Sequence, residues 1–263
     1  MDNKTKLQQI SKTKKSDQLP VTLWKTGPKN PNFPPETLHI WNIAFPVAPS
    51  VQQCLQDILS IEERLRAEQF YFAADKARFI VGRSALRHII AAYLNIPARE
   101  IQFNYAQNGK PELTPPRLHF NLSHAHQCIL IAISPDSPVG IDVEYFKHDL
   151  DFLAIADEFC SKAEYEKLLT TPDEEKYLAF FRCWTRKEAI IKAQGQGLSF
   201  PLKQLEVSFL PQEKVEILSF EDNPSFHSWK LEELNPRENY IAAIATPKPY
   251  KRIFFWHWDQ LAP

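Results

Sequence analysis

The sequence predicts an α+β protein made of two similar α/β halves, and two observations support this prediction. Segments with the 3.6-residue periodicity of helices alternate with short apolar runs that are typical of strands. The order of elements also repeats, because in each half a serine-started short helix, at Ser60 and at Ser161, precedes a long helix. The long helices each carry an aromatic residue and an arginine, Phe79 with Arg83 and Phe181 with Arg186. An internal duplication of this kind implies a natural site in the groove between the halves.

Composition and charge exclude several classes of protein. The chain has 263 residues and is 44% hydrophobic, which is enough for a substantial core. Its 31 Lys and Arg residues nearly balance its 32 Asp and Glu residues, without the basic excess of a nucleic-acid-binding protein. No run approaches the roughly 20 apolar residues that cross a bilayer, and residues 1–17 lack the apolar stretch of a signal peptide. We therefore expect a cytoplasmic protein with no nucleic-acid or membrane partner.

The cysteines point to no metal or disulfide framework. Cys54, Cys128, Cys160 and Cys183 include no C-x-x-C pair, and their spacings do not resemble those of paired zinc ligands. We expect four reduced thiols, most of them buried.

The first half is predicted to follow a tail. Residues 1–19 have the polar, Lys-rich composition of a disordered or loosely held segment. Residues 20–134 form the expected N-terminal subdomain, with a strand over 38–43 and a helix that starts at the Ser60 cap. A long helix after a break at 72–75 ends at Asn95, because a proline follows two residues later. A strand over 118–123 then enters a loop at 124–126, and a buried strand covers 127–134.

The second half, residues 135–263, repeats this plan as the expected C-terminal subdomain. A strand over 139–144 precedes the capped helix start at Ser161. A long helix from 173 to 194 is stopped by Gly195. Further strands are predicted over 205–210, 229–232, 240–245 and 253–258.

Two carboxylates on the predicted strand 139–144 are the first candidate for chemistry. Asp142 and Glu144 are two residues apart, so both side chains point to the same face of the strand. Neighbouring carboxylates repel each other and raise each other's pKa. A solvated surface strand tolerates such a pair, but a strand flanked by apolar residues favours a bound cation between them.

A polar face on an otherwise apolar helix is the second candidate. Trp184, Glu188 and Lys192 are spaced by four residues and therefore share one face. Glu188 and Lys192 have the order that favours an ion pair, and the simplest interpretation is a weak surface pair. The apolar residues around them make burial costly and favour a functional role.

The remaining candidates are polar groups in loops and basic groups on helices. Ser123 and His124 lie at the end of a predicted strand, where they could be a nucleophile and its base, or two polar loop residues with local hydrogen bonds. The G-x-S-x-G motif of hydrolases does not surround Ser123. His124 and His126 lack further ligands at metal spacing. Arg66 and Lys110 matter only where an anion binds nearby.

Taken together, these motifs are much more specific than any one of them. The order is Gly109-Lys110-Pro111, then Phe120-Asn121-Leu122-Ser123-His124, then Gly140-Ile141-Asp142-Val143-Glu144, then Trp184-Thr185-Arg186-Lys187-Glu188-Ala189, with Lys192 one turn later. This set closely resembles the signature of the Sfp-type 4′-phosphopantetheinyl transferases. The W-x-x-K-E-A form resembles the branch that includes many cyanobacterial enzymes.

The resemblance implies a fold in which the two halves form an intramolecular pseudo-dimer, with coenzyme A bound in the cleft between them. It assigns metal binding to Asp142, Glu144 and Glu188, and a place beside the pyrophosphate to Lys192. Ser123 and His124 match residues that touch phosphates, and Asn108, Gly109, Lys110 and Pro111 match a loop beside the nucleotide. Arg66 matches a basic position at the 3′-phosphate, where Phe79 replaces a small polar residue.

The implied activity is transfer of 4′-phosphopantetheine from coenzyme A to a serine of an acyl or peptidyl carrier protein, with release of 3′,5′-ADP. The implied cofactor is Mg²⁺, or Mn²⁺ in its place, and Glu188 and Lys192 are the candidate catalytic residues. We expect a monomer. Two alternatives remain: an Mg²⁺-dependent hydrolase of coenzyme A-type pyrophosphates and a non-catalytic relative that binds carriers.

Overall fold

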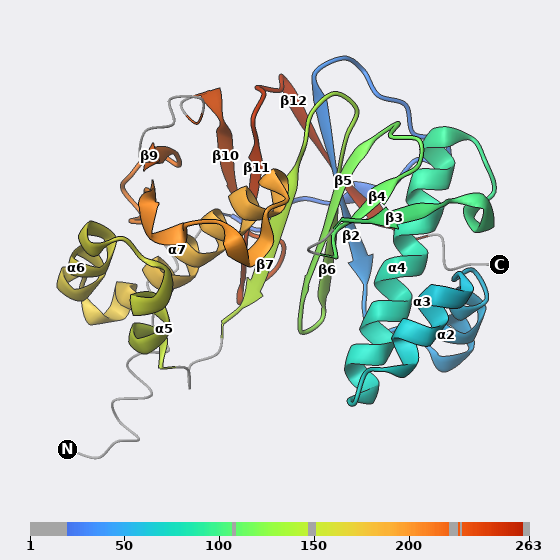
Figure 1. Cartoon of the computed structure of the whole chain (residues 1–263), viewed down its shortest axis with the longest axis horizontal. Coiled ribbons are helices and arrows are strands. Elements are labelled where there is room, and N and C mark those ends of the chain that lie inside the picture. The colour runs from blue at the N-terminus through green and yellow to red at the C-terminus, as the bar shows by residue number, and fades with distance from the viewer. Residues whose placement is uncertain (1–19, 107–108, 147–150, 221–225, 227, 260–263) are drawn as a thin grey trace.

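The computed structural model describes residues 20–106, 109–146, 151–220, 226 and 228–259 (Figure 1). The expected tail, residues 1–19, lies outside the described residues. Among the helices that are described, none combines the length and the hydropathy needed to cross a membrane. Cys54 is exposed, whereas the other three cysteines are buried free thiols, as expected.

The first half begins with the short strand β1 (Lys25–Thr26) and the strand β2 (Thr37–Ala44), which are followed by three helices and two hairpins. The helices are α2 (Pro49–Gln56), α3 (Ile61–Glu68) and α4 (Ala73–Leu94), and a short 3-10 turn η1 (Ala98–Glu100) follows them. The hairpins are β3 (Phe103–Tyr105) with β4 (Pro111–Leu113), and β5 (His119–Ala125) with β6 (Cys128–Ser134).

The second half has the same sequence of elements. Strand β7 (Gly140–Tyr145) leads to α5 (Phe152–Phe159), α6 (Lys162–Thr170) and α7 (Asp173–Gln194). After two 3-10 turns, η2 (Gly197–Ser199) and η3 (Leu202–Gln204), come the pairs β8 (Leu205–Val207) with β9 (Ile217–Phe220) and β10 (Lys230–Leu234) with β11 (Tyr240–Thr246).

The duplication predicted from the sequence is confirmed by the sheets. In the first half the strand before the helices and the hairpin after them are ordered β2-β6-β5, and in the second half β7-β11-β10. Each set is antiparallel throughout and places its last strand at the centre. Figure 1 shows α4 and α7 on opposite sides of the molecule with the strands between them. The predicted α+β class of two similar subdomains is therefore correct.

The local signals of the helix ends also repeat. Ser60 and Ser161 each close a capping box with the glutamate three residues later, Glu63 and Glu164. Helices α4 and α7 both have 22 residues and both end at a residue in the left-handed conformation, Asn95 and Gly195. The predicted bounds 173–194 of α7 are confirmed.

A buried ion pair joins the capped helix to the long helix in each half. Arg87 Nε lies 2.7 Å from Glu63, and Lys187 Nζ lies 2.5 Å from Glu164. Each cation also donates to two backbone carbonyl groups. The box glutamate therefore caps its own helix and at the same time fixes the long helix against it. Lys187, inside the W-x-x-K-E-A motif, is a structural residue.

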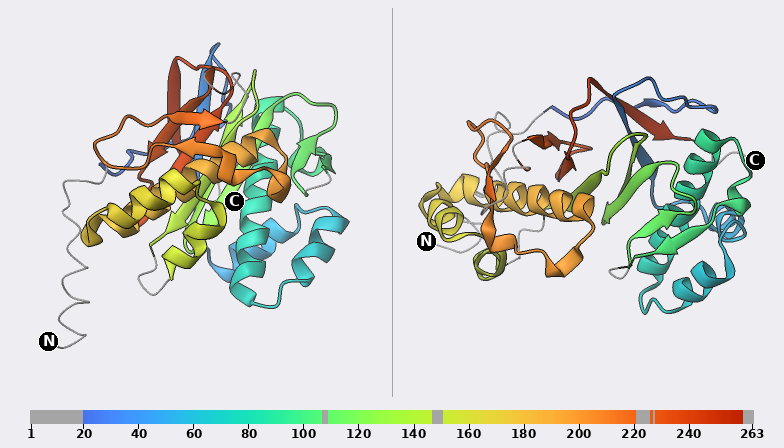
Figure 2. Two further views of the ribbon diagram at one scale, coloured as in Figure 1. Left: turned by 60° about the vertical axis from the view of Figure 1, so that its left-hand side comes forward. Right: turned by 45° about the horizontal axis from the view of Figure 1, so that its top comes forward.

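The final strand, β12 (Arg252–Trp258), lies with the first half of the chain. It pairs in parallel with β2, and the short strand β1 (Lys25–Thr26) pairs with its outer edge. Strand β12 therefore belongs to the same sheet as β2, whose edge pairs with the end of the chain (Figure 2). Strand β5 also runs through His124 and Ala125, so the loop expected at 124–126 is shorter and turns at His126.

Gly140 allows β7 to approach α7 more closely than any other residue type would. A Cβ built on Gly140 lies 1.9 Å from the carbonyl oxygen of Ala189 and 2.5 Å from the amide of Ala193, both backbone atoms that cannot turn aside. A Cβ on Gly82 in α4 meets nothing closer than 3.4 Å. Gly82 has room for a methyl group and can therefore serve as the control for a substitution at Gly140.

We expect Gly140→Ala to lower the free energy of unfolding by about 3 kcal/mol or more, because β7 and α7 must separate to admit the methyl group. Gly82→Ala should change it by no more than about 1 kcal/mol, since helix propensity offsets mild crowding. Urea unfolding of both variants checks this prediction. Equal midpoints for the two variants would contradict it.

Candidate active site

The two halves meet where β5 runs beside β7, and side chains make the junction. The amide of Ile141 donates to Asn121 Oδ1 at 2.8 Å, and the amide of Val143 donates to Ser123 Oγ at 3.3 Å. These bonds replace a backbone ladder between the strands, which belong to separate sheets. Because the side chains of Asn121 and Ser123 span the gap, β5 and β7 lie farther apart than paired strands, and the buried backbone amides of β7 still have acceptors.

Asp142 lies at the centre of this junction and is only 4% exposed. Its Oδ1 accepts from Ser123 Oγ at 3.0 Å and lies 2.5 Å from Lys192 Nζ. Lys192 also donates to Ser123 Oγ at 3.0 Å. Lys192 therefore pairs with Asp142 on the neighbouring strand of its own half, and not with Glu188 one turn earlier on its own helix.

Glu144 and Glu188 are placed on either side of Asp142 by β7 and α7. Glu144 Oε1 accepts from Trp184 Nε1 at 3.1 Å. Burial and then the charge of Asp142 raise the pKa of Glu144 to about 7. Burial and the same neighbour also raise the pKa of Glu188. The three acids thus form one electrostatically coupled cluster, although Glu188 is far from Asp142 and Glu144 in the sequence.

The cluster has the chemistry of a hard divalent cation site. Asp142 Oδ2 is buried and accepts no hydrogen bond, so it presents a lone carboxylate oxygen. Oxygen donors from carboxylates are what Mg²⁺ and Mn²⁺ prefer. A cation would relieve the repulsion that raises the two pKa values. Among the described residues, the carboxylate oxygens of these three acids do not all lie within 4.8 Å of one another. Lys192 neutralises Asp142 in this structure.

One other group of candidate ligands is present in the described part of the chain. Cys160, Glu164 and Cys183 place one ligand atom each within 4.8 Å of one another. Glu164 is already satisfied by Lys187 and two backbone amides, and burial raises the pKa of the Cys183 thiol. This group is therefore part of the core of the second half.

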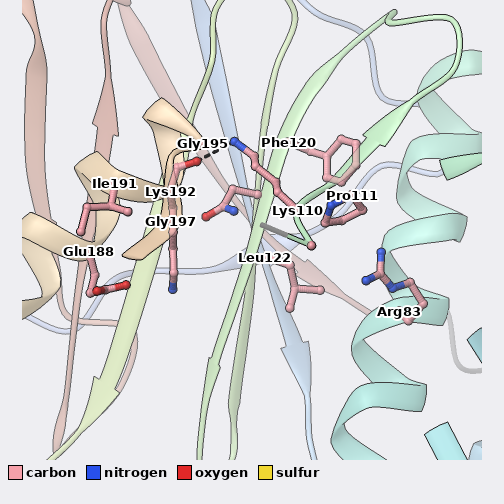
Figure 3. Close-up of a pocket in the computed structure, with 12 residues that line it drawn as sticks. Arg83, Lys110, Pro111, Phe120, Leu122, Glu188, Ile191, Lys192, Gly195 and Gly197 are labelled. Carbon is pink, nitrogen blue, oxygen red and sulfur yellow. Dashed lines mark hydrogen bonds between the residues drawn. The ribbon is translucent and has the colours of Figure 1, made fainter. Parts of the chain in front are cut away.

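A first cavity of about 360 Å³ opens on one side of the acids (Figure 3). Gly109, Lys110 and Pro111 line it, and Asn108 lies outside the described residues. Figure 3 shows Arg83 of α4 and Glu188 of α7 on opposite sides of the cavity. Lys110 Nζ donates to the carbonyl of Lys192 at 2.6 Å, so a loop of the first half reaches the end of α7.

A second cavity of about 440 Å³ opens on the other side, and Glu144 belongs to its wall. Its remaining lining combines aromatic rings with Arg78 and His124. Burial and the nearby Arg78 lower the pKa of His124, so its imidazole is neutral at physiological pH. The acid cluster therefore lies between a basic cavity and an aromatic cavity.

Arg66 does not join these residues. It is exposed in the last turn of α3, with its guanidinium 5.7 Å from the centre of the Phe79 ring. Arg83 lies at the same distance from that ring and lines the first cavity instead. The Phe79 ring thus contacts both arginines, and of the two only Arg83 lines the cavity.

Sequence reasoning missed the role of Asn121. It was part of the F-N-L-S-H motif, but its function of holding β7 appears only in the tertiary structure. A buried asparagine between two apolar strand residues is the signal that could have revealed it, because buried amides need partners.

The raised pKa of Glu144 predicts a pH-dependent stability. A carboxyl group whose pKa is higher in the folded than in the unfolded chain stabilises the fold below about pH 4.5, and this contribution disappears as the pH rises through about 7. In EDTA, we expect the free energy of unfolding to fall by up to roughly 3 kcal/mol over this interval because of Glu144. Glu144→Gln should flatten that part of the profile. An unchanged profile in this variant would contradict the assignment.

Two family models match the chain. Residues 46–136 match the model described as "4′-phosphopantetheinyl transferase, N-terminal", and residues 138–245 match the "4′-phosphopantetheinyl transferase superfamily".

Curated relatives agree over most of the length. The chain is 35% identical to 4′-phosphopantetheinyl transferase HetI of Nostoc sp., over 89% of this chain and 98% of that protein. It is 37% identical to transferase psf-1 of Bacillus pumilus, over 74% of this chain and 82% of the relative. It is 31% identical to 4′-phosphopantetheinyl transferase Sfp of Bacillus subtilis, over 82% of this chain and 95% of that protein.

The duplicated fold, with a cluster of acids and a lysine between two cavities, defines an enzyme of the group-transfer class. The matches specify which one: the chain belongs to the 4′-phosphopantetheinyl transferase superfamily. The family resemblance predicted from the sequence motifs is confirmed.

Proposed function

We propose that the chain transfers 4′-phosphopantetheine from coenzyme A to a serine of an acyl or peptidyl carrier protein and releases 3′,5′-ADP. The observation that carries this proposal is the coupled cluster of Asp142, Glu144 and Glu188 with Lys192, open to a cavity on each side. A donor with an anionic nucleotide, a central pyrophosphate and an amphipathic arm matches this sequence of environments.

The first cavity suits the nucleotide end of coenzyme A. Arg83, Lys110 and Lys192 line it with positive charge, which favours phosphate groups. The aromatic second cavity suits the pantetheine arm, whose amides and methylene groups pack on aromatic rings. Ser123 and His124 lie between, where the phosphates would be held. Arg66 keeps its predicted role at the 3′-phosphate only if its exposed side chain turns past Phe79.

Asp142, Glu144 and Glu188 would hold Mg²⁺, or Mn²⁺ in its place, and the cation would neutralise charge on the pyrophosphate. Burial and the charge of Asp142 raise the pKa of Glu188, which makes its carboxylate a stronger base. Glu188 is therefore the candidate general base for the serine hydroxyl group. Lys192 Nζ can leave Asp142 for a phosphate oxygen and stabilise the charge that develops in the transition state.

The proposal includes a monomer that acts in the cytoplasm. The monomeric state is supported by the site itself, because residues from β5, β7 and α7 of one chain build the cluster without a second copy.

The test is intact-protein mass spectrometry of an apo carrier protein incubated with this protein, coenzyme A and Mg²⁺. We expect a gain of about 340 Da, one phosphopantetheine arm in ester linkage to serine. The gain should be absent in EDTA and should form much more slowly with Glu188→Gln. Formation of free phosphopantetheine without a carrier would instead identify a hydrolase. Coenzyme A binding without any gain on several unrelated carriers would leave a non-catalytic binder.

A further inference from the structure

The turn between β5 and β6 is made by His126, which has φ of 46°, in the left-handed region. Histidine is one of the non-glycine residues that adopt this region most readily. The conformation ends strand β5 sharply and places the imidazole beside the second half.

The contacts of His126 all lead to the wall of the second cavity. Its imidazole stacks on the ring of Tyr145, with 4.9 Å between ring centroids and 20° between planes. Its Nδ1 lies 3.4 Å from the hydroxyl of Tyr240, which accepts from the amide of Gln127. Its carbonyl accepts from Arg78 Nε at 3.0 Å. One residue of the first half is thus joined to β7 and β11 of the second half and to α4.

The cavity that these contacts border has an amphipathic lining. Rings of Tyr145, Phe180, Phe181 and Trp184 form much of it, and Asp75, Arg78 and Glu144 contribute charges. His126 itself lines the cavity and remains exposed, so the outer face of its stack with Tyr145 is accessible. Planar amide groups pack well on an aromatic surface of this kind.

We propose that His126 and Tyr145 form an aromatic ledge that binds the amide-bearing arm of the donor, and that His126 is a specificity-determining residue for it. This inference rests on the proposed function, which puts coenzyme A across the two cavities. The ledge contacts the arm and leaves the nucleotide untouched. Its loss should therefore affect ligands that carry the arm and spare ligands that lack it.

The experiment compares the binding of coenzyme A and of 3′,5′-ADP, which has no arm, by isothermal titration calorimetry with Mg²⁺. His126→Gly removes the ring and accepts the backbone conformation, and His126→Asn is the matched variant that keeps a polar side chain in a tolerated conformation. We expect both to bind coenzyme A roughly three- to tenfold more weakly, the scale of one lost aromatic contact, with unchanged affinity for 3′,5′-ADP. Tyr145→Leu should have the same effect, and Tyr145→Leu added to His126→Gly should weaken binding little further.

The outcomes separate the inference from the function on which it rests. An equal loss for both ligands would show a merely structural turn and overturn the ledge. Unchanged coenzyme A affinity in His126→Gly, with normal transfer by the wild-type chain, would overturn the ledge alone. A wild-type chain that binds coenzyme A but modifies no carrier would overturn the proposed transfer while the ledge is still measured by binding.

Discussion

Replacing Glu188 by glutamine is expected to reduce the transfer rate roughly 10²–10⁴-fold, the range of general-base catalysis. The same change should stabilise the protein. Burial and the charge of Asp142 raise the pKa of Glu188, so its ionised form opposes folding at neutral pH, and a neutral side chain removes that penalty. We therefore expect a higher melting temperature for Glu188→Gln than for the wild-type chain.

The measurement pairs steady-state transfer rates with thermal unfolding in EDTA. Glu174→Gln is the matched control, since Glu174 is an exposed acid in the first turn of the same helix. It should leave the transfer rate unchanged. A Glu188→Gln variant that transfers at the wild-type rate would exclude Glu188 from proton transfer. A rate loss accompanied by a lower melting temperature would indicate a structural role instead.

Replacing Lys187 by methionine is expected to have the largest effect on stability. Lys187 is fully buried, and the substitution leaves the carboxylate of Glu164 buried without its cation. Removing one partner of such a buried ion pair lowers the free energy of unfolding by about 3–5 kcal/mol. Urea unfolding of Lys187→Met should show this loss, and Arg87→Met should show a smaller one in the first half, because Glu63 keeps a second cation in Arg83 at 3.6 Å.

The double variant Lys187→Met with Glu164→Gln provides the control. Glutamine carries no charge that needs a partner, and its one carbonyl oxygen can still accept from the amide of Ser161 or of Val207. Part of the lost stability should therefore return. If Lys187→Met abolished transfer at unchanged stability, Lys187 would belong to the active site and not to the framework of the second half.

Local physics allowed much of the fold to be predicted from the sequence. The capping boxes at Ser60 and Ser161 depend on residues only three apart, and the stop at Gly195 depends on one residue in the left-handed conformation. Strand periodicity likewise put Asp142 and Glu144 on one face of β7, and helix periodicity put Trp184, Glu188 and Lys192 on one face of α7. The short helices α2 and α5 were missed, because their starts carry weaker signals: α2 lacks a side-chain cap, and α5 begins at an Asp151 cap without a capping box.

The sequence by itself determined the family, the two halves and the set of acids, because these depend on residue identity and short-range spacing. Only the tertiary structure decided how the polar groups are paired. It joined Lys192 to Asp142 and Trp184 to Glu144, gave Lys187 a structural partner in Glu164, and put β12 beside β2. Such pairings are between residues 23 to more than 200 positions apart, and they are selected by which faces of sheets and helices bury together, a property of packing that no local pattern encodes.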